Sequence, residues 1–113
     1  MENNTVLLFT RNGLGHGSED LQLMLAGKYL NLLLESGDLP AKVLFYTDGV
    51  RLACDGSPVL EQFRTLEARK VELVLCKTCL DYFGLTDKVR AGIVGGMGDI
   101  LEAMQKAGKV ISL

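Results

Sequence analysis

Short apolar runs alternate with helix-like segments along this chain of 113 residues. The runs at 6–10, 41–46 and 71–75 are nearly continuous in apolar residues, which is typical of strands buried on both faces of a parallel sheet. Weaker strands are expected at 91–94 and 109–112, and the helices between the strands at 19–35, 58–69 and 99–107. We therefore predict a single domain over residues 1–113, a three-layer α/β/α fold with a five-stranded, mainly parallel sheet and flavodoxin-like layering.

The composition argues against several classes of protein. The net charge is −2 and the 12 Lys and Arg residues are spread along the chain, so we expect no direct DNA binding. The longest apolar stretch, 21–34, is interrupted by Lys28 and Asn31, so we expect no membrane span. No signal-peptide pattern precedes the first strand, and three cysteines fit a reducing compartment. We therefore expect a cytoplasmic protein.

The predicted helix at 19–35 carries more apolar side chains than one packed face requires. Ser18 is placed to cap its start, and Gly37 to end it. A helix packed on a sheet needs an apolar stripe of only about 100°. Here most of the circumference is covered by Leu21, Leu23, Leu25, Tyr29, Leu30, Leu32, Leu33 and Leu34. We therefore predict that another subunit covers part of this helix.

The third predicted strand stops at a Cys-x-x-Cys motif, Cys76 and Cys79. Thr78 and Asp81 have the spacing of a capping box, which predicts a short helix beginning there. The free N–H groups and positive dipole end of that helix would face both sulfurs, and Lys77 adds a positive charge. Such surroundings lower the pKa of a thiol and favour the reactive thiolate. If the chain carries out chemistry, we expect it here, with Cys76 as the nucleophile. Cys79 could form a disulfide that resolves a persulfide or sulfenic acid on Cys76, or it could pack on the face of the helix.

A loop at 11–18, rich in glycine, follows the first strand. Carboxyl ends of parallel strands share one edge of a sheet, so this loop should meet the loops at 47–49 and 76–79. The loop lacks the Lys-Ser/Thr of a P-loop and the third glycine of the dinucleotide fingerprint, so we expect no cofactor. A tight turn suffices to explain its glycines, but a backbone nest for a small anion also fits. The residues predicted to bind that anion are Gly15, His16, Gly17, Lys77 and Thr78.

A metal site is not expected. A structural zinc ion needs four protein ligands, and one Cys-x-x-Cys motif with a single distant histidine does not supply them within one chain.

Several of these motifs resemble the DsrE/DsrF/TusD family of small sulfur-relay proteins. They are the strand, glycine-rich loop and leucine-rich helix at the start, the Gly-Val-Arg-Leu run at 49–52, and the third strand ending in cysteine. The Gly-Ser-Pro-Val-Leu run at 56–60 and the segment 76–85 resemble a narrower branch, the DsrE-like domain of YedF-type proteins. That branch is sulfurtransferase-like and linked to selenium metabolism.

The resemblance implies a compact α/β domain that assembles into a trimer or hexamer, here through the 19–35 helix. It also implies that the cysteine at the end of the third strand carries persulfide sulfur between donor and acceptor proteins. Cys76 matches that position, and Cys79 matches the second cysteine of the narrower branch. Lys77 stands where that branch usually has glycine, which is a departure from the pattern.

The leading hypothesis is therefore a cytoplasmic sulfur-relay protein in which the Cys76 thiolate accepts persulfide sulfur and passes it on. One alternative is a non-catalytic module that binds an anion or a partner and has structural cysteines. Another is a Cys-x-x-Cys dithiol oxidoreductase, although Gly84 should end the helix after the motif earlier than is usual for such proteins.

Overall fold

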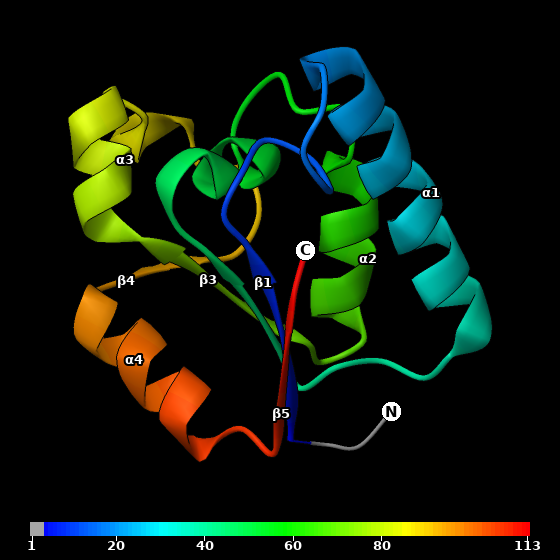
Figure 1. The fold of residues 1–113 in the computed structure, drawn as a ribbon. Helices are drawn as coiled ribbons and strands as arrows, with labels where there is room; N and C mark the ends of the chain where they lie inside the picture. Colours follow the sequence, from blue (N-terminus) through cyan, green and yellow to red (C-terminus); the bar gives the residue numbers. More distant parts are fainter. Residues whose placement is uncertain (1–3) are drawn as a thin grey trace.

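The computed structural model describes residues 4–113, and a parallel five-stranded sheet forms its centre (Figure 1). Every neighbouring pair of strands is parallel, in the order β4-β3-β2-β1-β5. The strands are β1 (Thr5–Phe9), β2 (Lys42–Phe45), β3 (Glu72–Cys76), β4 (Ile93–Gly95) and β5 (Lys109–Ser112). The predicted fold class is confirmed, and the three apolar runs that indicated buried strands form the sheet's central strands.

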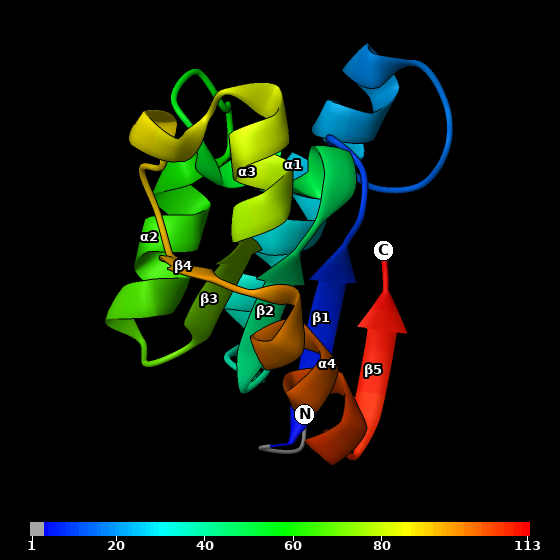
Figure 2. The same cartoon turned by 90° about the vertical axis from the view of Figure 1, so that its left-hand side faces the viewer.

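Helices cover both faces of the sheet. The helices α1 (Glu19–Ser36) and α2 (Leu60–Ala68) lie together on one face, and α4 (Met97–Lys106) crosses the other (Figures 1 and 2). The short helix α3 (Lys77–Phe83) stands at the carboxyl end of β3. Two 3₁₀ helices, η1 (Thr47–Ala53) and η2 (Thr86–Lys88), complete the regular structure of the described residues.

Three phenylalanines join the sheet to α2. Phe9 and Phe45 stack on neighbouring strands with ring centroids 5.9 Å apart. Phe63, from α2, meets both rings edge-on at 5.8 and 5.1 Å. All three are fully buried, and edge-to-face pairs add about 0.5–1.5 kcal/mol each to the free energy gained by burial. This cluster fixes β1 and β2 against α2, and so fixes the edge from which their loops leave.

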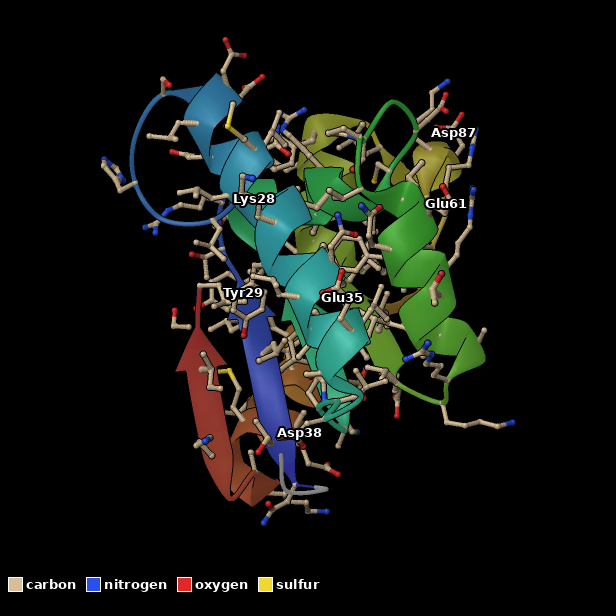
Figure 3. The ribbon with its side chains drawn as sticks, turned by 90° about the vertical axis from the view of Figure 1, so that its right-hand side faces the viewer. Lys28, Tyr29, Glu35, Asp38, Glu61 and Asp87 are labelled. Atoms are coloured by element: carbon tan, nitrogen blue, oxygen red, sulfur yellow. The ribbon has the colours of Figure 1, made fainter. Side chains whose placement is uncertain are left out.

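Part of the exposed surface of α1 is apolar in the single chain. Its buried residues are only Ala26, Leu30 and Leu33, while Met24 and Leu32 are 59% and 65% exposed. In Figure 3, which looks onto this helix, Lys28 and Glu35 lie on its outer side and Tyr29 lies toward β1 and β5. As expected, α1 carries apolar side chains that the rest of the chain does not cover. The subunit contact through this helix stays a prediction.

Some predicted boundaries differ from those observed. The helix expected from residue 58 begins at Leu60, because the Ser57 hydroxyl accepts a hydrogen bond from the Val59 N–H in a preceding turn. The helix expected from Asp99 begins two residues earlier, at Met97, because the Asp99 carboxylate accepts a hydrogen bond from Gly96 N–H and so caps the helix start. No helix within residues 4–113 has the length and apolar character needed to cross a membrane.

Candidate functional site

Cys76 is the last residue of β3, and its exposed fraction is 0%. It pairs in register with Gly95 of β4, so it continues the buried strand instead of standing in a loop after it. Leu75 before it and Leu80 in the following helix are fully buried as well. The prediction that Cys76 ends the third strand is confirmed. The expectation that its sulfur is accessible is wrong for the isolated chain, because the strand lies one residue further along than predicted and Cys76 is paired within the sheet.

Cys79 lies in the first turn of α3 and is half-buried. The Thr47 N–H donates a hydrogen bond to the Cys79 sulfur at 3.1 Å, and the Cys76 thiol lies close enough to influence the pKa of Cys79. Burial raises the pKa of Cys79, and the Thr47 N–H offsets this only in part, while Cys76 and Asp48 raise it further. The predicted lowering of the thiol pKa is therefore wrong for Cys79, which is protonated at neutral pH.

Lys77 and Thr78 do not join the two sulfurs in a site. The helix α3 begins at Lys77 with Cys76 at its N-cap, so Thr78 lies inside the first turn and cannot cap. The Lys77 ammonium is exposed and pairs with the Asp81 carboxylate at 2.7 Å. That carboxylate also accepts a hydrogen bond from the Thr86 hydroxyl at 2.7 Å. The predicted capping box is therefore wrong. Thr78 lies inside the helix, and the Asp81 carboxylate is bonded to Lys77 and Thr86.

Thr47 connects three loops at the carboxyl edge of the sheet. Its N–H reaches Cys79, and its hydroxyl donates to the carbonyl oxygen of Thr10 at the end of β1. Its φ is 49°, a left-handed conformation that is rare for a β-branched residue. Figure 1 shows the loop after β1, the helix η1 and α3 gathered at this edge. The sequence placed the 47–49 loop here, but no motif singled out Thr47.

A polar hollow of about 410 Å³ lies between the loop after β1 and the start of η1. It is lined by Arg11, Asn12, His16, Glu19, Gln22, Asp48 and Arg51. Of the residues predicted to bind an anion, only His16 lines it. The Gly17 N–H donates to the Gln22 side-chain oxygen at 3.0 Å, so it is already used within the loop, and Gly15 adopts a left-handed φ of 79°.

Arg51 links this hollow to the helix that carries Cys79. Its Nε donates to an Asp48 carboxylate oxygen at 3.0 Å. Its guanidinium lies over the Phe83 ring, with the central carbon 4.2 Å from the ring centroid. Phe83 is one turn after Cys79 on α3, so η1 holds the cysteine helix through one side chain.

Two further features lie outside this edge. Cys54 is buried, and burial raises the pKa of its thiol. A second cavity of about 450 Å³ lies between α4 and the amino-terminal part of the sheet, lined by residues such as Lys42, Glu72 and Glu102. Within residues 4–113, no three His, Cys, Asp or Glu side chains are grouped as a metal site would require.

These features define the class: an α/β protein with a dithiol pair and a polar hollow at the carboxyl edge of a parallel sheet. The profile of the DsrE/DsrF-like family matches residues 5–113, and the chain belongs to this family. The predicted family is thus confirmed, over almost the whole chain.

Solved structures share the fold. The ychN protein from E. coli is 22% identical, with a TM-score of 0.71, over 99% of this chain and 100% of that one. MTH1491 from Methanobacterium thermoautotrophicum, a protein of unknown function, is 16% identical, with a TM-score of 0.72 and the same coverage. BT1422 from Bacteroides thetaiotaomicron is 15% identical, with a TM-score of 0.68, over 97% of this chain and 95% of that one. No curated protein matches the chain.

Proposed function

We propose that this protein accepts persulfide sulfur and passes it on through the Cys76–Cys79 pair, with Cys79 as the sulfur that meets the donor. The observation that carries the proposal is the environment of Cys79. Its sulfur is partly accessible, receives a backbone N–H from Thr47, and contacts a second thiol. Membership of the DsrE/DsrF-like family supports a role in sulfur relay. The donor and acceptor are expected to carry a persulfide and a thiol, respectively.

The transfer needs no oxidant. The small ionised fraction of Cys79 attacks the outer sulfur of a donor R–S–SH, the donor's S–S bond breaks, and R–S⁻ leaves and takes up a proton from water, which replaces the one that Cys79 released; the product is Cys79–S–SH. An acceptor thiolate then attacks the outer sulfur of Cys79–S–SH and restores the Cys79 thiolate. The Thr47 N–H stabilises the anionic sulfur at the beginning and end of this cycle, because it points at that sulfur in the resting protein.

The position of Cys76 beside Cys79 favours a second candidate function, that of a dithiol oxidoreductase. Because its sulfur contacts Cys79, the Cys76 thiol can attack the inner sulfur of Cys79–S–SH and release H₂S. The products are H₂S and a Cys76–Cys79 disulfide, so the outer sulfur is reduced while the Cys76 sulfur is oxidised and the Cys79 sulfur keeps its oxidation level. A return to the dithiol then requires an external thiol reductant.

The test is to locate the sulfur after incubation with inorganic polysulfide. Lys77 lies between the two cysteines, so trypsin places Cys76 and Cys79 in different peptides after free thiols and persulfides have been blocked with iodoacetamide. We expect the added sulfur on the Cys79 peptide. The Cys76→Ser variant should retain it, the Cys79→Ser variant should lose it, and Cys54→Ala is the matched control.

Three results discriminate among the functions. Sulfur on the Cys76 peptide that persists in Cys79→Ser would contradict the role given to Cys79. Accumulation of the disulfide with release of H₂S would favour the oxidoreductase. Failure of every variant to gain sulfur, with both thiols slow to react, would favour a binding module with structural cysteines, which the complete burial of Cys76 would explain.

A further inference from the structure

We propose that the polar hollow beside Cys79 binds the sulfur donor, and that this donor is a persulfide carrying an α-amino-acid group, such as cysteine persulfide or glutathione persulfide. The inference rests on the proposed function and names the substrate class of the same site. It is carried by the charges that line the hollow, by the rigidity of its walls and by its distance from the Cys79 sulfur.

The lining presents both signs of charge. Asp48 and Arg51 form an ion pair, whereas within residues 4–113 the side chains of Arg11 and Glu19 have no hydrogen-bond or ion-pair partner. A phosphate or sulfate would meet the carboxylates of Glu19 and Asp48, and a simple cation would meet two guanidinium groups. A zwitterion satisfies both sets, with its carboxylate on Arg11 and its ammonium on Glu19.

The walls are fixed before any ligand arrives. The Gln22 side chain accepts a hydrogen bond from the Gly17 N–H and donates one to the Asn12 carbonyl oxygen, which holds the loop on α1. Gly13 packs so closely on the Gln22 backbone that an added Cβ would lie 2.4 Å from it. On the opposite wall, Phe83 holds the Arg51 guanidinium. The backbone of the hollow is therefore ordered in advance, and on binding the conformational entropy is lost mainly by the Arg11 and Glu19 side chains.

The hollow is near enough to Cys79 to deliver sulfur. Asp48 directly follows Thr47, whose N–H donates to the Cys79 sulfur at 3.1 Å. Bond geometry therefore puts the Asp48 Cα within about 8 Å of that sulfur. A volume of about 410 Å³ lies in the range of small-molecule sites. A bound amino-acid persulfide can thus extend its outer sulfur past Asp48 to Cys79, which takes it while the amino-acid thiolate leaves.

The experiment measures the rate of Cys79 persulfidation with four donors: cysteine persulfide, glutathione persulfide, N-acetylcysteine persulfide and inorganic polysulfide. The first three carry a carboxylate, the N-acetyl compound lacks the ammonium, and polysulfide lacks both. The variants are Arg11→Ala and Glu19→Gln. The control is Lys28→Ala, which removes one positive charge from the outer side of α1 (Figure 3).

We expect the rate to saturate with an amino-acid persulfide and not with polysulfide. Arg11→Ala should lower kcat/KM for the three carboxylate donors about tenfold, the effect of losing one charge-assisted hydrogen bond. Glu19→Gln should slow cysteine and glutathione persulfides but not the N-acetyl donor. Lys28→Ala should change none of the rates. The donor with the larger kcat/KM, cysteine or glutathione persulfide, identifies the natural source.

The two proposals fail in different ways. If no donor, polysulfide included, places sulfur on Cys79, the proposed function is wrong. If polysulfide loads Cys79 but the amino-acid persulfides react without saturation and independently of Arg11 and Glu19, the relay stands and this inference is overturned. An equal loss with all four donors in Arg11→Ala would also overturn it, because that result indicates general electrostatic attraction.

Discussion

The strongest test of the cysteine assignment is the order in which the three cysteines of the native protein react with iodoacetamide. The thiolate is the reacting species. The pKa of Cys79 lies above its ordinary value of 9.0, so at pH 7 less than about 1% of this thiol is ionised. Its alkylation rate should therefore rise about tenfold per pH unit from pH 7 and should not level off below pH 9.

Cys76 and Cys54 should be protected because they are 0% and 2% exposed. They can react only after a local or global opening, and an opening that costs about 3 kcal/mol lowers the rate more than a hundredfold. We therefore expect Cys79 to react at least about a hundred times faster than either one at the same pH.

The assay is quenched alkylation followed by tryptic mapping, since each of the three cysteines falls in its own peptide. Alkylation in concentrated urea gives the reference rates, because all three sulfurs are then exposed. Two results would refute the reasoning. One is a Cys76 rate equal to or above that of Cys79. The other is a Cys79 rate that is already level at pH 7, which would require a lowered pKa.

Three further substitutions test the structure around the site. Gly13→Ala places a Cβ against the Gln22 backbone at a φ of 135°, so it should destabilise the fold by about 1–3 kcal/mol and abolish any saturation by amino-acid persulfides. An unchanged Tm would contradict the close packing. Phe63→Ala removes the ring that bridges two strands and α2 and should cost about 3–5 kcal/mol in urea unfolding, whereas a loss below 1 kcal/mol would mean that the cluster is not the core. Lys77→Ala breaks only an exposed ion pair, so the pH dependence of Cys79 alkylation, followed by intact mass, should stay the same. A shifted pH dependence would show that the Lys77 charge does affect the sulfur.

The architecture could be predicted because its signal is local. A continuous apolar run such as residues 71–75 fits a strand covered on both faces, and helical segments between such runs allow only parallel crossovers. The excess of leucine on α1 was equally visible, because a helix has a fixed period and only one of its faces meets the sheet.

The burial of Cys76 could not be predicted, because it depends on whether β3 ends at residue 75 or at residue 76. Had β3 ended at Leu75, Cys76 would stand in a turn, as the sequence pattern indicated. Pairing of Cys76 with Gly95 of β4 keeps the residue in the sheet, and no property of residues 71–79 alone encodes that pairing. The same shift moves the start of α3 to Lys77, takes the capping role from Thr78 and leaves Asp81 to pair with Lys77.

The order of the strands explains why the donor hollow and the dithiol are neighbours although no motif contains both. The strands β1, β2 and β3 are adjacent, so the loops at their carboxyl ends follow one another along one edge. The first loop supplies Arg11, the second supplies Thr47 and Asp48, and the third supplies the cysteines. Because Thr47 lies between them and hydrogen-bonds to both sides, its left-handed backbone is a strain that the flanking loops maintain. The segment that turns its N–H toward Cys79 therefore also places Asp48 in the hollow, so one backbone conformation determines both where a donor can bind and which sulfur it can reach.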